Sequence, residues 1–198
     1  YYTSGNLKEY YQYQDGLRHG DFEEYSTYGY LLLKGSFDQG AKDGEWNFFY
    51  YTGDKEKTSN YKNGQLHGDY TYYFDNGTVN VEGKYKEGKK TGQWHWYNNQ
   101  GGKDMTGSFK EDLQHGRWMY YYENGELSYK AEYKNGLRVG EWEYFYKDGS
   151  KFKVGNFAND LKNGNWKTWY EDGTLLLDGD YIDGLEEENG KITGKMEC

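Results

Sequence analysis

The chain of 198 residues contains no proline and a single cysteine, Cys198, at its very end. One cysteine cannot form an internal disulfide, so the fold does not depend on an oxidising compartment. No apolar run approaches the roughly 18 residues of a membrane-spanning helix. Lys and Arg total 24 against 33 Asp and Glu, a net charge of −9. This balance argues against nucleic acid and anionic membrane surfaces as partners, because both attract clustered cations.

Aliphatic side chains are also scarce, whereas aromatic ones are abundant. Hydrophobic residues make up 34% of the chain and aromatic residues alone 21%, with 25 tyrosines among them. Any core must therefore be built from rings. Rings bury large areas, and tyrosine can keep its hydroxyl in contact with water.

Glycine and the rings recur with a strict period of 24 residues, which indicates a repeat protein. The first glycine series is Gly20, Gly44, Gly68, Gly92, Gly116, Gly140 and Gly164. The second is Gly5, Gly29, Gly53, Gly77, Gly101, Gly125, Gly149 and Gly173. The third is Gly16, Gly40, Gly64, Gly88, Gly136 and Gly184, with Asp112 and Asp160 in its gaps. Two residues after each first-series glycine stands a large ring: Phe22, Trp46, Tyr70, Trp94, Trp118, Trp142 and Trp166.

Each repeat is predicted to be a β-hairpin, because glycine recurs too often for a helix and the rings alternate. Asn-Gly and Asp-Gly pairs at the second glycine series, such as Asn124-Gly125, predict two-residue type I′ turns. We expect a loop of about six residues to follow each hairpin. This turn would place Glu123 opposite Glu126 and Tyr122 opposite Leu127.

The same register sets each large ring opposite a small residue, and this complementarity supports it. It pairs Trp118 with Ala131 and sets Trp142 over Gly155. Alternation then defines two faces of the strands. The large rings occupy one face, here called the Trp face. The other, the ladder face, carries a second aromatic row, here called the ladder: Tyr25, Phe49, Tyr73, Tyr97, Tyr121, Phe145 and Trp169.

The predicted fold class is all-β: an elongated, single-layer antiparallel sheet of consecutive hairpins, open at its ends. A single hairpin is too small to be stable alone, so stability must come from stacked neighbours. Residues 1–184 are expected to hold about eight repeats, of which the first is truncated, with Tyr1 and Tyr2 in the slots of Tyr121 and Tyr122. Residues 185–198 are expected to form a degenerate cap with a short hairpin at Asn189-Gly190.

The pattern resembles the MORN repeat superfamily, specifically its bacterial variant. The resemblance is carried by GEWEYFYKDGS (140–150), YKNGLRVGEWEYFY (133–146) and YYENGELSYKAEYKNG (121–136). It implies a groove-like sheet of hairpins that serves protein interaction or scaffolding, in the bacterial cytoplasm or cell envelope. Similar bacterial proteins are often labelled antitoxins. The classical family is also linked to membrane lipids, which the acidic charge of this chain disfavours.

No pattern for an enzyme, a cofactor or a metal site is found. His19, His67 and His115 share one slot but stand 48 residues apart, or roughly 20 Å along such a sheet. Metal ligands must converge on one ion, so these histidines are expected to be loop residues. The carboxylates also fall in repeated slots, whereas acid–base catalysis needs an asymmetric pair.

The ladder is the candidate partner-binding site, because a single-layer sheet has little against which to bury rings on its second face. Exposed aromatic rows mark binding surfaces. The surrounding acidic residues favour a basic protein as the partner. A glycan that stacks on the rings, and a purely structural spacer within a longer envelope protein, are the alternatives.

Overall fold

The computed structural model describes residues 1–188 and 191–193, and the secondary structure in these ranges is entirely β. The chain divides into two compact units, Tyr1–Gly101 and Gly102–Cys198. The first unit holds β1 (Glu9–Gln14), β2 (Leu17–Tyr25), β3 (Leu31–Asp38), β4 (Ala41–Phe49), β5 (Lys55–Lys62), β6 (Gln65–Tyr73), β7 (Val79–Lys86) and β8 (Lys89–Tyr97). The second holds β9 (Lys103–Lys110), β10 (Leu113–Tyr121), β11 (Leu127–Lys134), β12 (Leu137–Phe145), β13 (Lys151–Ala158), β14 (Leu161–Trp169), β15 (Leu175–Ile182), β16 (Leu185–Glu188) and β17 (Lys191–Thr193).

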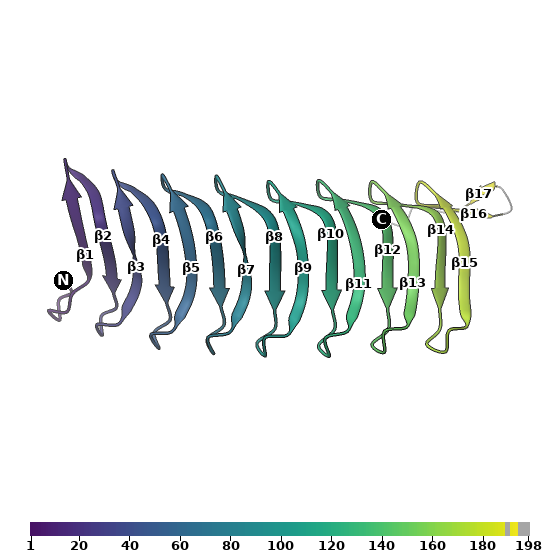
Figure 1. The fold of residues 1–198 in the computed structure, drawn as a ribbon, viewed down its shortest axis with the longest axis horizontal. Coiled ribbons are helices and arrows are strands. Elements are labelled where there is room, and N and C mark those ends of the chain that lie inside the picture. Colours follow the sequence, from purple (N-terminus) through teal and green to yellow (C-terminus); the bar gives the residue numbers. More distant parts are fainter. Residues whose placement is uncertain (189–190, 194–198) are drawn as a thin grey trace. The chain divides into compact units, whose positions relative to one another are not determined.

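Within each unit, every strand pairs antiparallel with the next strand in the chain. Each unit is therefore an open, single-layer run of hairpins (Figure 1). The predicted fold class is confirmed. In the described ranges, no helix is long and apolar enough to cross a membrane. The predicted terminal turn at Asn189-Gly190 lies outside the described residues, although the strands on either side of it, β16 and β17, do pair.

The two kinds of turn are exchanged relative to the prediction. The two-residue turns lie at the third glycine series: Asn135 and Gly136, between β11 and β12, both have positive φ, at 52° and 86°. A type I′ turn requires this of both central residues. Asp112 and Asp160 fill the same position with φ of 68° and 71°. Asparagine and aspartate tolerate this left-handed conformation better than most side chains.

Asn124-Gly125 instead lies in a five-residue loop, 122–126, between β10 and β11. Only the glycine of this pair has positive φ, and Asn124 Oδ1 accepts a hydrogen bond from the backbone N–H of Glu126 at 3.1 Å. The predicted two-residue turn here is wrong, as is the pairing of Tyr122 with Leu127. Leu127 pairs with Tyr121, and a bulge separates this pair from the other residue pairs of β10 and β11.

Away from the loop, the predicted register is confirmed. Trp118 pairs with Ala131 and Trp142 with Gly155. A bulge between each even-numbered strand from β2 to β14 and the strand before it was not predicted. In β10 it falls between His115 and Met119, so the three residues of 116–118 face only Gly107. A first-series glycine with positive φ lies within each of these bulges, such as Gly116 at 74°.

The bulge turns four of the tryptophan rings, Trp46, Trp94, Trp118 and Trp166, onto a glycine of the preceding strand. A Cβ at Gly155 would overlap the indole of Trp166, and one at Gly107 would overlap Trp118. Although Trp142 pairs with Gly155 in register, the ring that covers Gly155 belongs to Trp166. The position of Gly155 therefore needs a small residue because a ring of the next hairpin lies on it. Its own cross-strand partner, Trp142, does not impose this need.

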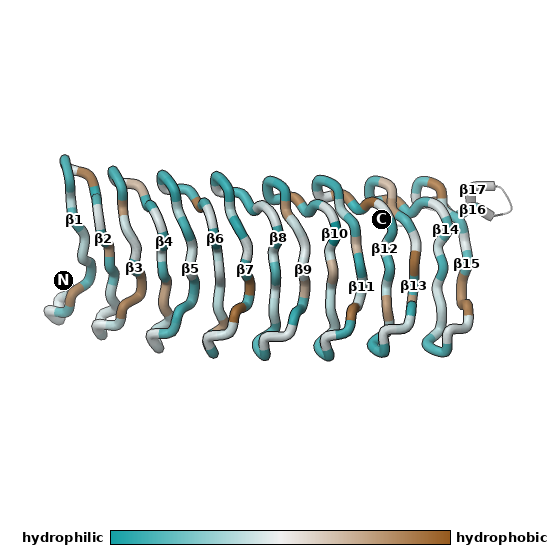
Figure 2. Tube along the Cα trace, viewed as in Figure 1, coloured by the Kyte–Doolittle hydropathy of each residue, from teal (hydrophilic) through white to brown (hydrophobic). Residues whose placement is uncertain are grey.

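The core of each unit is a row of these rings along the Trp face. Trp118, Trp142 and Trp166 are at most 5% exposed. Phe157 lies between two of them, with ring centroids 5.2 Å from Trp142 and 5.0 Å from Trp166 in edge-to-face contacts, the geometry that aromatic pairs prefer. Figure 2 shows few strongly hydrophobic stretches along the strands, because tyrosine and tryptophan are near neutral in hydropathy. An edge-to-face aromatic row replaces the usual aliphatic core.

Candidate partner-binding face

The ladder residues each end an even-numbered strand, at the point where the chain enters a five-residue loop. Tyr25 ends β2 and Phe145 ends β12, with the other members at the same place in β4, β6, β8, β10 and β14. All seven side chains are half-buried. In the described ranges no two ladder rings are in ring contact, so the ladder is a row of separate half-exposed rings rather than a stack.

Hydrogen bonds to the backbone carbonyl groups of ladder residues join successive repeats. Tyr122 donates its hydroxyl to the carbonyl oxygen of Phe145 at 2.7 Å. The same bond links three other pairs at 2.8 Å: Tyr2 with Tyr25, Tyr50 with Tyr73, and Tyr146 with Trp169. The bond of Tyr2 confirms its predicted equivalence to Tyr122. Each of these bonds spans 23 residues, so a loop tyrosine anchors the strand end of the next repeat. The recurrence of tyrosine directly after the ladder slot is the signal that the sequence analysis missed.

Ladder side chains contact polar groups on their own face. The Tyr97 hydroxyl donates to Glu82 at 2.8 Å and the Tyr25 hydroxyl to Glu23 at 2.5 Å. Lys130 lies 5.2 Å from the ring centroid of Phe145. Burial, together with Glu82, raises the pKa of Tyr97 to about 12. The bond from Tyr25 is the main cause of the lowered pKa of Glu23. At neutral pH the ladder therefore presents neutral phenols beside carboxylates.

Two hollows open on the ladder face at equivalent repeat positions, 48 residues apart. In the second unit a hollow of about 320 Å³ is lined by Arg117, Trp118, Met119, Lys130, Ala131, Glu132, Glu141 and Glu143. In the first unit one of about 280 Å³ is lined by Asp69, Tyr70, Thr71, Glu82, Gly83, Lys84, Gln93 and His95. Both form where a bulge faces a small residue, Ala131 or Gly83, since the bulge turns its large ring to the Trp face.

Carboxylates dominate the rim of the hollow beside Ala131 in the second unit. Glu143 is held by Lys130 and Lys151, each at 2.9 Å, and hydrogen bonds from these lysines lower its pKa. Glu132 and Glu141 are exposed, and neither side chain forms an ion pair with any residue that the structure describes. These two carboxylates are therefore available to a cationic group of a partner.

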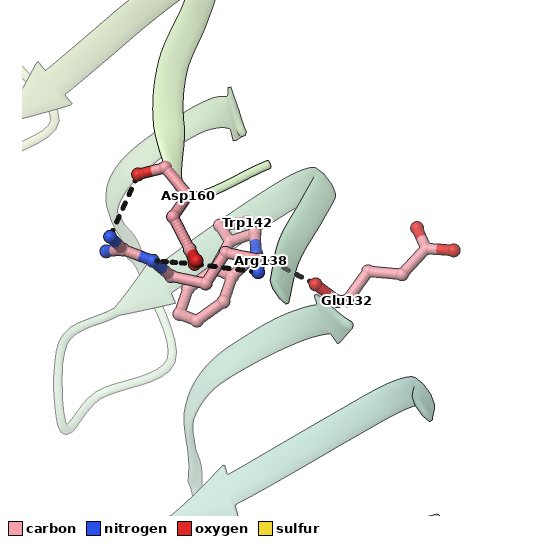
Figure 3. A network of polar contacts seen from close by, with 4 residues as sticks. All are labelled: Glu132, Arg138, Trp142 and Asp160. Atoms are coloured by element: carbon pink, nitrogen blue, oxygen red, sulfur yellow. Dashed lines mark hydrogen bonds and ion pairs between the residues drawn. The ribbon is translucent and has the colours of Figure 1, made fainter. Parts of the chain in front are cut away.

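A polar network ties the Trp face to the tight turns (Figure 3). Arg138 Nε donates to Asp160 Oδ1 at 3.0 Å, and its terminal nitrogen donates to the Asp160 carbonyl oxygen at 2.9 Å. The backbone N–H of Arg138 also donates to this carboxylate and is the main cause of its lowered pKa. Nearby, the Trp142 indole donates to the Glu132 carbonyl oxygen at 3.3 Å. Figure 3 shows the Glu132 carboxylate pointing away from this network.

The three histidines of the shared slot, His19, His67 and His115, lie within strands β2, β6 and β10, near the tight turns that precede these strands, so the expectation that they are loop residues is wrong. His19 Nδ1 is 3.3 Å from Asp38, and His67 Nδ1 accepts a long hydrogen bond from the backbone N–H of Glu87 at 3.5 Å. Within the described ranges, no group of three or more His, Cys, Asp or Glu side chains is arranged to hold a metal ion.

Hairpins that stack through rings and present a second, polar and aromatic face define a repeat-type scaffold domain. Comparison with known families identifies the repeat: the MORN repeat variant matches residues 42–63, 66–87, 114–135 and 162–183. The chain belongs to this family of repeat proteins.

Other comparisons add little. A comparison with curated proteins found no match. Among solved structures, one similar chain is described as "Crystal structure of GtfA/B complex bound to UDP and GlcNAc". It is 14% identical, with 58% of this chain and 22% of that chain covered and a TM-score of 0.25. So slight a likeness bears on neither the fold nor the function.

Proposed function

We propose that this protein is a non-catalytic scaffold whose ladder face docks a basic protein partner, in the manner of an antitoxin or immunity protein. The observation that carries the proposal is the acid-rimmed hollow of the second unit, which lies beside the half-exposed ladder rings. Aromatic side chains in partly buried sites are the usual anchors of protein interfaces. Carboxylates without cationic partners select a positively charged surface and speed its approach.

The ionisation of the carboxyl groups supports a non-catalytic role. A general acid at neutral pH needs a carboxyl whose pKa is raised. The carboxyl groups with shifted pKa in the described ranges all move the other way: Glu23, Glu143, Asp148, Asp160, Asp172 and Asp178. Hydrogen bonds and lysines keep these groups ionised, which suits them to attract cations rather than to transfer protons.

Photocrosslinking in the producing cells tests this proposal. A benzophenone amino acid replaces Tyr121, on the ladder face, and in a control chain it replaces Tyr28, a loop residue that is 81% exposed. We expect one protein of high isoelectric point to be captured in stoichiometric amount from Tyr121 and not from Tyr28. Equal capture from both positions, or capture of a glycan from Tyr121, would contradict the proposal.

A further inference from the structure

Two lysines converge on the Trp face of the first unit, opposite the ladder. Lys42 Nζ lies 4.1 Å from the ring centroid of Trp46, 5.1 Å from that of Tyr61 and 5.5 Å from that of Phe48. Lys57 Nζ lies 3.8 Å from the same ring of Phe48. Both side chains are half-buried. The two ammonium groups thus share one ring.

Among the residues that the structure describes, these two cations have no carboxylate partner. In the described ranges neither Lys42 nor Lys57 forms an ion pair, although the chain as a whole carries a charge of −9. Burial and the like charge of Lys57 lower the pKa of Lys42, and the more distant Glu24 opposes this only in part. Two positive groups held together without a counter-charge favour an anion between them.

The second unit shows what this position accepts. Arg138 and Lys153 occupy the slots that Lys42 and Lys57 occupy 96 residues earlier. There the carboxylate of Asp160 binds Arg138 at 3.0 Å. The residue equivalent to Asp160 in the first unit is Gly64, with φ of 79° in the same type of turn. The place of that carboxylate is therefore vacant beside Lys42.

Cation–π contact alone does not explain the arrangement. Lysine stems often cover apolar surface while the ammonium stays in water, and each lysine could cover a ring of its own. Lys42 and Lys57 each lie closest to a ring of their own, Trp46 and Phe48, but Lys42 Nζ is also 5.5 Å from Phe48, which brings two like charges to one ring. The rings of Trp46 and Tyr61 beside them offer apolar surface next to the positive charge, as a peptide with both carboxylates and apolar side chains requires.

We propose that Lys42 and Lys57, with Trp46, Phe48 and Tyr61, bind an acidic segment of a protein. One carboxylate of the segment meets Lys42 in the position that Asp160 occupies beside Arg138 in the second unit, another meets Lys57, and its apolar side chains lie on the rings. This site lies on the face opposite the ladder, since Phe48 and Phe49 are successive residues of one strand. It is separate from the proposed docking of a basic partner.

The test measures binding of a fluorescent peptide of alternating Glu and Leu to the whole chain. The Lys42→Met and Lys57→Met double variant keeps the stems and removes both charges, and we expect roughly tenfold weaker binding. Gly64→Asp supplies the carboxylate that the second unit contains and should weaken binding to a similar extent, while its fold is retained, because Asp160 adopts the same turn. Gly64→Asp also keeps the test informative if the double variant unfolds.

Matched controls locate the effect. Gly136→Asp adds the same charge in an equivalent turn, but the slot that would face it holds Gln114 rather than a cation. Lys55→Met removes one lysine of the same strand, which pairs with Phe49 of the ladder. Unchanged binding in both controls supports the proposal. Equal weakening in Gly136→Asp and Gly64→Asp overturns it, as does no binding of the peptide to the parent chain. Binding of inorganic phosphate or phosphatidylserine vesicles through Lys42, without binding of the peptide, overturns it as well.

Discussion

The indole of Trp166 occupies the space that a Cβ on Gly155 would need. The two residues lie on neighbouring strands, β14 and β13, which a tight turn at Asn159-Asp160 connects. The same contact joins Trp118 to Gly107 and, in the first unit, Trp46 to Gly35 and Trp94 to Gly83. It is the repeated unit of packing by which one hairpin is fastened to the next.

Gly155→Ala should therefore destabilise the second unit by about 2–3 kcal/mol, because the added methyl forces the buried Trp166 ring to move. Ala131→Gly is the matched control, since Ala131 shows that the equivalent position beside Trp142 accepts a methyl group. We expect a cost of about 1 kcal/mol or less there. Urea unfolding followed by tryptophan fluorescence measures both. Equal effects would mean that ring overlap does not restrict Gly155.

Tyr122→Phe should cost about 1 kcal/mol, since it removes a hydrogen bond of 2.7 Å to the Phe145 carbonyl oxygen and leaves that oxygen without its partner. The reverse change is available in the first unit, where Phe74 stands in the slot of Tyr122. Phe74→Tyr can add a bond to the Tyr97 carbonyl oxygen and should raise the midpoint of thermal unfolding. A rise in Tyr122→Phe, or a fall in Phe74→Tyr, would contradict the role assigned to the loop tyrosines.

The contribution of Asp160 should depend on pH. Its pKa is lowered in the folded state, chiefly by hydrogen bonds from Arg138. Its stabilising contribution is thus complete above its unfolded pKa, about 3.9, and is lost as the pH falls through the lower folded value. Both side chains are 41% exposed, so screening limits the contribution to about 1 kcal/mol or less. Asp160→Asn should be less stable than the parent chain at pH 7, and the difference should shrink under acid. A difference that stays constant down to strong acid would contradict this account.

Size complementarity made the central register predictable from the sequence. Each large ring was paired with a small residue, such as Trp118 with Ala131, and the 24-residue period repeats this pairing many times. The pairing is correct, although the ring that covers Gly155 is that of Trp166 rather than its cross-strand partner Trp142. The turns could not be separated in the same way, since Asn124-Gly125 and Asn135-Gly136 are the same dipeptide. Side-chain hydrogen bonds such as that of Asn124 to Glu126, rather than local composition, distinguish the loop from the tight turn.

The candidate site was predictable only in part. Alternation predicted the ladder as one row of slots, but the predicted turn at Asn124-Gly125 kept Tyr121 inside its strand, whereas the structure places it at the strand end. The hollows beside them depend on bulges in which three residues of one strand face one residue of its neighbour. Such a bulge can be recognised only when the pairing of the two strands is known. The preference of the Lys42 and Lys57 site for an acidic partner could not be predicted from composition either, because the net charge of −9 is a sum over both faces.

The most direct test of the scaffold account is the affinity of the crosslinked partner for a chain with Glu132→Gln and Glu141→Gln, measured by titration calorimetry. Both carboxylates rim the hollow beside Ala131 in the second unit. The control carries Asp54→Asn and Glu171→Gln, which remove the same charge from two exposed loops that do not line this hollow. The account predicts roughly tenfold weaker binding for the hollow variant and little change for the loop variant. Equal weakening in both, or none in the hollow variant, would contradict it.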